Sequence, residues 1–97
     1  MKINIDIDEL ENISEILKVM AHPIRLCIVK GLIDNGPCNV SNMQECFQIP
    51  QPTVSSHLGK LKRAGILEST REGTEIYYRV ESQFIKDIIY SVFSKSA

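Results

Sequence analysis

Hydrogen-bonding side chains are concentrated in one stretch of the chain, residues 51–63. Val54, Leu58 and Leu61 recur at helical spacing, which predicts an amphipathic helix with these residues facing a core. The residues beside or opposite that stripe are polar and mostly short: Gln51, Thr53, Ser55, Ser56, Lys60 and Arg63. Serine and threonine are mediocre helix formers, so helix stability does not explain them. Their donors and acceptors match the base edges and phosphates of DNA. The alternative is that this is only a solvated helix face.

Charge is distributed unevenly along the 97-residue chain, whose net charge is -1. Residues 51–65 contain three basic side chains and no acidic one, whereas residues 1–20 contain two lysines and five acidic side chains. The positive patch therefore coincides with the polar helix, where it can contact phosphates and supply non-specific affinity for DNA. The near-neutral total predicts only modest non-specific binding.

Hydrophobic periodicity and chain breaks predict the elements that position this helix. We predict helices over residues 10–20, from 23 to the break at 35–37, from a cap at Asn39 or Ser41 to 47, and over 51–64. The third and fourth are separated only by residues 48–50, so they form a helix-turn-helix. Gly65 is predicted to end the fourth helix in the left-handed conformation.

The periodicity changes from helix to strand after Gly65. Residues 66–70 and 75–80 are rich in β-branched and aromatic side chains and predict two strands joined by residues 71–74, and a last helix covers 84–93. The predicted fold class is mainly α with a small β-hairpin, a winged helix-turn-helix with four helices before the hairpin and one after it. Residues 1–97 are expected to form a single domain.

The last helix is apolar over an unusually wide part of its surface. Its apolar residues fall on two adjacent lines: Phe84, Ile88 and Val92, then Ile85, Ile89 and Phe93. A terminal helix of this kind in a small chain is typical of contact with a second copy of the protein. The alternative is that the helix only covers the core of its own chain.

Four segments in this order resemble the ArsR/SmtB family, and within it the PagR-like repressors: residues 17–26 (LKVMAHPIRL), 51–58 (QPTVSSHL), 64–67 (AGIL) and 71–78 (REGTEIYY). The resemblance spans about residues 10–93. It implies a winged helix-turn-helix homodimer that binds an imperfect inverted repeat in a promoter and blocks transcription. It also implies a dimer interface made by the first and last helices, here Leu10, Ile13, Phe84, Ile85, Ile88, Ile89 and Val92.

The resemblance also implies DNA-binding roles for individual residues. Gln51, Thr53, Ser55 and Ser56 would lie in the major groove, Lys60 and Arg63 near phosphates, and Arg71 and Thr74 on the wing near the minor groove. His57 stays open between a DNA contact and a half-buried hydrogen-bonding role. His22, in the Ala-His-Pro turn, is expected to be structural.

No metal site and no other cofactor is expected. Zinc-sensing members use aspartate and histidine pairs on the last helix, but residues 82–97 contain no histidine and Asp87 is their only acid. Arsenic-type sites use a Cys-x-Cys motif at the start of the third helix, because paired thiolates hold a soft ion. Cys38 occupies the first of these positions, and Val40 occupies the second.

Three cysteines, Cys27, Cys38 and Cys46, are candidates for thiol chemistry. They do not form a disulfide framework, since three thiols cannot all pair within one chain. Cys38 lies near a predicted helix start, where the helix dipole favours the thiolate. Constitutive repression, repression switched by oxidation or persulfide formation, and inert cysteines all remain open.

The sequence argues against an enzyme and a membrane protein. It has no glycine-rich phosphate loop or metal triad, and neither histidine has a predictable nucleophile or acid partner. It has no apolar run of about 18 residues and no leader pattern, so a cytoplasmic location is expected. The expected partner is double-stranded operator DNA. A winged-helix module that binds another protein is the competing hypothesis, although such surfaces usually carry large apolar anchors.

Overall fold

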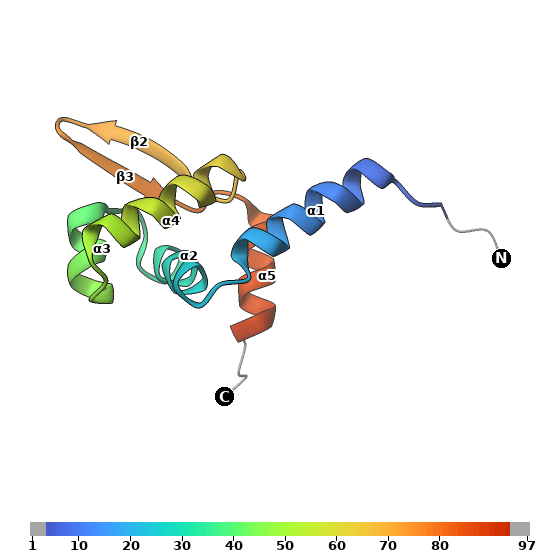
Figure 1. Cartoon of the computed structure of the whole chain (residues 1–97), viewed down its shortest axis with the longest axis horizontal. Coiled ribbons are helices and arrows are strands. Elements are labelled where there is room, and N and C mark those ends of the chain that lie inside the picture. The colour runs from blue at the N-terminus through green and yellow to red at the C-terminus, as the bar shows by residue number, and fades with distance from the viewer. Residues whose placement is uncertain (1–3, 94–97) are drawn as a thin grey trace.

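The computed structural model describes residues 4–93, which form five helices and three short strands (Figure 1). The helices are α1 (Ile7–Met20), α2 (Pro23–Asn35), α3 (Val40–Phe47), α4 (Gln51–Arg63) and α5 (Gln83–Phe93), and the strands are β1 (Cys38–Asn39), β2 (Glu68–Glu72) and β3 (Glu75–Arg79). The predicted class, mainly α with a small β-hairpin between the fourth and fifth helices, is confirmed.

The helix-turn-helix is formed by α3, a three-residue turn and α4. Asn39 caps α3, since its side chain accepts a hydrogen bond from the backbone N–H of Asn42 at 2.8 Å. Gln48 then adopts the left-handed conformation with φ of 55°, which ends α3, and Pro50 leads into α4. Of the two predicted caps, Asn39 is therefore the one that the protein uses.

The end of α4 follows the Schellman pattern. The N–H of Ile66 donates to the carbonyl of Leu61, and the N–H of Gly65 donates to the carbonyl of Lys62, both at 3.0 Å. Gly65 has φ of 79°, a conformation that costs an L-residue with a side chain about 1 kcal/mol or more. The predicted left-handed glycine is confirmed, with α4 ending one residue earlier than expected.

The core lies where α2, α3, α4 and α5 meet. Its buried members include Ile28, Val29, Leu32, Met43, Val54, Leu58, Leu61, Ile66, Leu67, Ile85 and Ile89. Gly31 lets α3 approach α2 closely, because a side chain there would place its Cβ 2.6 Å from the ring of Phe47. The close packing of α2 against α3 supports the helix-turn-helix on the side of the core.

The sheet differs from the predicted hairpin in two ways. Its order is β1-β3-β2, and β1 pairs Cys38 with Tyr78; this strand of two residues was not predicted. The first hairpin strand begins at Glu68, because Ile66 and Leu67, which were assigned to it, are buried in the core before the strand starts. Their apolar character reflects burial between the helices.

Ile85 and Ile89, two of the residues predicted for the dimer interface, are buried within a single chain. Their side chains are only 1% and 2% exposed within a single chain, since they pack into its core. They have almost no surface left to give to a second subunit. Phe84 and Val92 on the same helix remain exposed. One of the two predicted apolar lines of α5 therefore packs into the core through Ile85 and Ile89, and the other lies at the surface.

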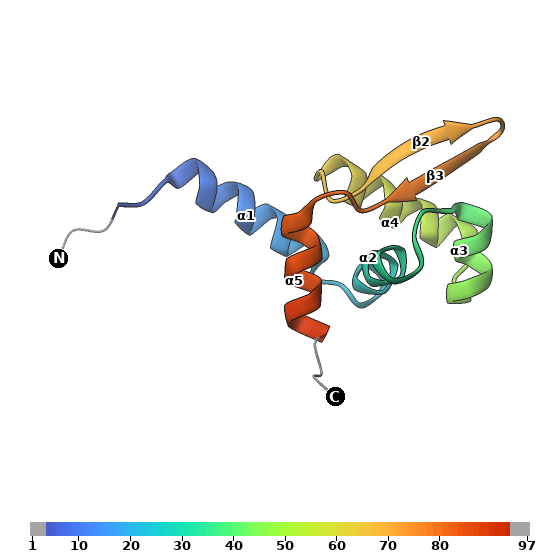
Figure 2. The same cartoon turned by 180° about the vertical axis from the view of Figure 1, so that it is seen from behind.

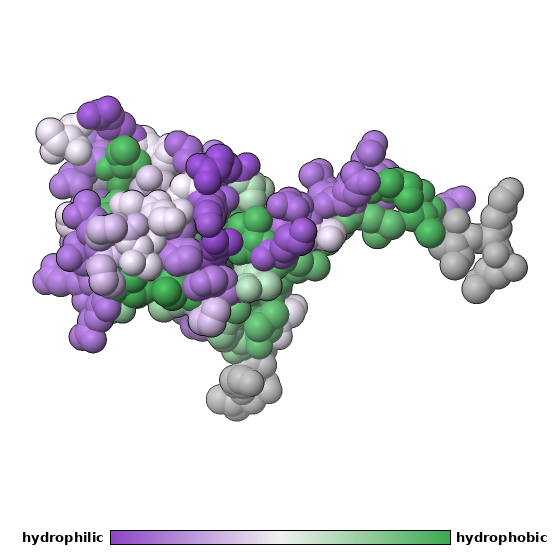
Figure 3. Space-filling model, viewed as in Figure 1, coloured by the Kyte–Doolittle hydropathy of each residue, from purple (hydrophilic) through white to green (hydrophobic). Residues whose placement is uncertain are grey.

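Helix α1 projects from the body of the molecule in both views (Figures 1 and 2). Only Met20 at its end is buried, whereas Leu10 and Leu17 are 53% and 47% exposed. Figure 3 shows apolar surface along the projecting arm. No helix within residues 4–93 is both long and apolar enough to span a membrane.

Candidate nucleic-acid interface

Helix α4 presents its polar face to solvent. Figure 1 shows α4 crossing the front of the molecule, with α3 at one end and the hairpin beside it. The exposed residues of this face include Gln51, Ser55, Ser56, Lys60 and Arg63, while Thr53 and His57 are half-buried. Because the apolar stripe of α4 is fully buried, the helix is held firmly while its polar face stays free for a ligand.

The outer face of α4 carries no large apolar side chain. Among the described residues, the exposed large hydrophobic side chains lie on the N-terminal segment, α1, α5 and the hairpin, and none lies on α3 or α4. Gly59 has no side chain, so nothing projects from the outer face of α4 at this position. The guanidinium Nη1 of Arg63 lies 3.5 Å from the position that a Cβ at residue 59 would take. This surface suits a polar, anionic partner better than the apolar surface of another protein.

His57 is half-buried and takes part in a hydrogen bond between α2 and α4. Its Nδ1 accepts from Nε of Arg25 at 3.0 Å, and its ring lies 4.6 Å from that of His22 between centroids. Burial lowers the pKa of His57, and electrostatic interactions with His22, Arg25 and Lys60 lower this pKa further. The neutral ring is the form that can accept, so the structure shows the hydrogen-bonding alternative, and a DNA contact by His57 stays a prediction.

His22 caps α2. Its Nδ1 accepts from the backbone N–H of Ile24 at 3.1 Å, and Pro23 follows at the first helical position. The predicted structural role of the Ala-His-Pro turn is thus visible as a helix cap.

The tip of the wing is tighter than predicted. Arg71 and Glu72, assigned to the loop, continue β2 and pair with Ile76 and Glu75. The turn therefore contains only Gly73, with φ of 66°, and Thr74. The exposed Arg71 donates from Nε to the carbonyl of Gly73 at 3.2 Å, which holds its side chain along the tip.

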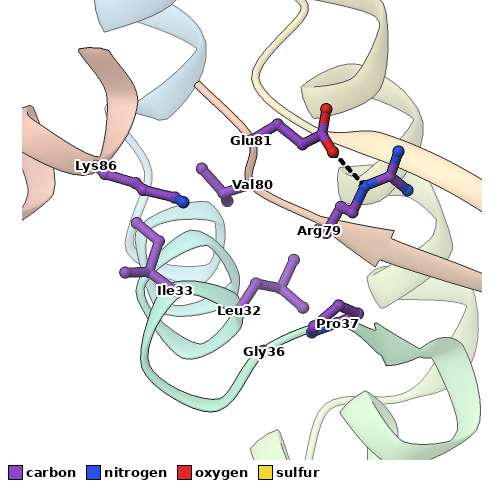
Figure 4. Close-up of a pocket in the computed structure, with 8 residues that line it drawn as sticks. All are labelled: Leu32, Ile33, Gly36, Pro37, Arg79, Val80, Glu81 and Lys86. Atoms are coloured by element: carbon purple, nitrogen blue, oxygen red, sulfur yellow. Dashed lines mark hydrogen bonds and ion pairs between the residues drawn. The ribbon is translucent and has the colours of Figure 1, made fainter. Parts of the chain in front are cut away.

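The base of the wing is held by Arg79 at the end of β3. Its Nη1 donates to Oγ1 of Thr70 on β2 at 2.6 Å, and its Nε forms an ion pair with Glu81 at 2.9 Å. Figure 4 shows this pair on one side of a cavity of about 380 Å³, with Lys86 of α5 on the opposite side. These contacts set the direction in which the wing leaves the body.

The three cysteines lie in different environments. Cys27 and Cys46 are exposed and Cys38 is half-buried. Burial raises the pKa of Cys38, and the nearby thiol of Cys46 adds to the rise. The pKa of Cys38 is therefore raised, opposite to the direction expected from its place near a helix start, because loss of hydration disfavours the thiolate. The more accessible thiols are Cys27 and Cys46.

We expect a neutral thiol reagent at pH 7 to modify Cys38 several times more slowly than Cys27 or Cys46. Burial limits access to Cys38 and reduces its thiolate fraction. The rate of Cys38 modification should therefore increase with pH only at a higher pH than the rates of the other two cysteines. Three variants that each retain one cysteine, with serine at the other two positions, allow the rates to be compared by absorbance. If Cys38 reacts fastest, its environment differs from the one described.

No three side chains among histidine, cysteine, aspartate and glutamate come together at a metal-binding spacing in residues 4–93.

The sequence analysis did not single out Arg25, which joins α2 to α4 through its hydrogen bond with His57. The only signal was its place in the segment Ala21-His-Pro-Ile-Arg25. Its partner lies 32 positions along the chain, so no local pattern could reveal their contact.

Known proteins share both the sequence pattern and the architecture. Residues 20–70 match a family model described as a helix-turn-helix domain. The transcriptional repressor PagR of Bacillus anthracis is 42% identical over 80 residues, which cover 82% of this chain and 80% of that protein. An HTH-type transcriptional regulator of Methanocaldococcus jannaschii is 39% identical over 82 residues, covering 84% and 92%.

Solved structures agree with these sequence relatives. The crystal structure of PagR has a TM-score of 0.83 at 39% identity, covering 90% of this chain and 99% of that one. The repressor BigR from Xylella fastidiosa has a TM-score of 0.78 at 30% identity, covering 89% and 90%.

The helix-turn-helix, the hairpin beside it and the exposed polar face of α4 define a winged helix-turn-helix protein, and the fold is that of DNA-binding regulators rather than enzymes. The chain belongs to the ArsR/SmtB family of transcriptional regulators.

Proposed function

We propose that the protein is a repressor that binds an inverted-repeat operator as a homodimer in the cytoplasm. The observation that carries this proposal is the polar outer face of α4, which combines exposed hydroxyls, an amide and cations on a helix anchored by three buried apolar residues. In this family such a helix reads the major groove, and symmetric dimers match symmetric DNA half-sites.

The proposed interface joins the exposed apolar residues of α1 and α5. Leu10 on α1 and Phe84 and Val92 on α5 are 53%, 44% and 57% exposed, an arrangement that a partner subunit would cover. Ile13 and Ile88 are half-buried and would contribute their remaining surface. Ile13 and Phe84 also line one shared cleft of about 550 Å³, so the two helices meet where the second subunit would bind.

The contacts proposed with DNA follow the positions of the exposed side chains. Gln51, Thr53, Ser55 and Ser56 lie toward the start of α4 and would contact base edges, and Lys60 and Arg63 near its end would contact phosphates. On the wing, Arg71 and Thr74 would reach the adjacent minor groove. His57 would act by positioning α4 through Arg25.

Fluorescence anisotropy with DNA from upstream of the protein's own gene tests this function. We expect specific binding about 1,000-fold tighter than to random duplex at physiological salt. Equal affinity for both duplexes would contradict the proposal. Sedimentation of the protein–DNA complex provides the stoichiometry, which should be two subunits for each operator.

A thiol-switched repressor is the second candidate, favoured by the exposed thiols of Cys27 on α2 and Cys46 on α3. Both helices pack against α4, so modification of either thiol would act on the position of the DNA-binding helix through a direct contact. The same titration with matched reduced and oxidised samples separates the candidates. Reversible loss of specific binding on oxidation supports the switch, and equal binding supports constitutive repression.

A further inference from the structure

Three cations converge on a cleft of about 330 Å³ between α1, α2 and α4. Its lining residues are Glu15, Val19, Arg25, Lys60, Arg63 and Ala64. Within residues 4–93, none of the three cations forms an ion pair within 4.0 Å. The cleft adjoins the polar outer face of α4, since Lys60 and Arg63 belong to both.

Arg25 is held in place by two neutral acceptors. Its Nη1 donates to the carbonyl of Val19, and its Nε donates to Nδ1 of His57, both at 3.0 Å. A guanidinium has five N–H donors, so several remain for a ligand after these two bonds. A half-buried guanidinium without a carboxylate partner gains from an anion, because its charge is only partly hydrated.

The cleft has an excess of positive charge. Glu15 is the one acid that lines it, against Arg25, Lys60 and Arg63. The positive charges of Arg25 and Lys60 also reach His57 at the edge of this region. The cations repel one another, and a bound anion would relieve that repulsion. The rigid guanidinium provides planar donors that match phosphate oxygens.

We infer that this cleft binds one phosphate group, and that in the DNA complex it holds a backbone phosphate of the operator. The inference rests on the proposed DNA-binding function. It adds Arg25 of α2 to the contacts provided by α4. It also assigns a role to the hydrogen bond between Arg25 and His57, which is to position the guanidinium. That bond fixes the guanidinium beside Lys60 and Arg63 before DNA arrives, so little side-chain entropy is lost on binding.

The salt dependence of DNA binding tests the inference. We expect Arg25→Gln to weaken operator and random duplexes by a similar factor of about ten and to lower the slope of log affinity against log salt by about one. Arg25→Lys should keep most of the slope, because it keeps the charge. Lys86→Gln on α5 removes one positive charge that does not line this cleft and should leave the slope unchanged. Thermal unfolding of each variant checks that the fold is retained.

A second measurement distinguishes a DNA phosphate from a free phosphate. The NMR signal of the Arg25 Nε–H is followed while inorganic phosphate replaces chloride at constant ionic strength. A reduced slope in Arg25→Gln supports the DNA phosphate, whereas an unchanged slope with a saturable NMR shift assigns the cleft to a small phosphate-bearing ligand. An unchanged slope without a shift overturns the inference. The ratio of operator to random affinity reports on the proposed function separately, since a phosphate contact does not depend on sequence.

Discussion

Ser56→Glu is expected to weaken operator binding by at least roughly 100-fold, or about 3 kcal/mol, while the protein stays folded. Ser56 is exposed on the outer face of α4, where a carboxylate would meet the phosphates and acceptor atoms that line the groove. Repulsion from the phosphates and the loss of a short donor both act against binding. Glutamate is a good helix former, so the unfolding free energy should change little.

The control for Ser56→Glu is Gln83→Glu, which adds the same charge at an exposed position at the start of α5. Anisotropy titrations at one salt concentration should show near-normal operator binding for this control. Retention of tight operator binding by Ser56→Glu itself would show that the outer face of α4 does not face DNA.

Leu10→Asp is expected to weaken dimerisation by about 1,000-fold. Leu10 is 53% exposed and does not belong to the core of its own chain, so the substitution costs a single subunit little. Burial of one leucine contributes about 2 kcal/mol, and a twofold interface buries two, which gives about 4 kcal/mol for the dimer. The unpaired carboxylate would add to the loss.

Analytical ultracentrifugation measures the expected change directly. Gln44→Asp introduces the same side chain at an exposed position on α3, away from both helices of the proposed interface, and should leave the dimer intact. A Leu10→Asp protein that remains dimeric at low micromolar concentration would refute a role for this part of α1. Operator affinity should fall in parallel with dimerisation, because each half-site alone provides only part of the contacts.

The sequence predicted the elements that carry strong local signals. The period of α4, the break before it and Gly65 after it placed the polar face correctly, because side-chain direction in a helix follows directly from spacing. The cap at Asn39 was foreseen as one of two. Polar and apolar alternation therefore sufficed to locate the surface proposed to bind DNA.

The features that the sequence did not reveal depend on contacts between distant segments. β1 is only two residues long and exists because β3 provides its hydrogen bonds. Ile85 and Ile89 look like Phe84 and Val92 in sequence, yet only the packed structure shows which pair turns inward. The raised pKa of Cys38 likewise comes from burial, and the contact of Arg25 with His57 joins two separate helices.

The projecting position of α1 bears on the lifetime of a lone subunit. The first part of the helix, residues 7–12, is exposed throughout within its own chain, and an isolated helix of 14 residues is only marginally stable in water. In a subunit without a partner, α1 would unwind readily and offer proteases an extended, apolar segment. The proposed pairing of two subunits would protect that segment, so a single subunit is expected to be cleaved faster by a protease than an assembled one.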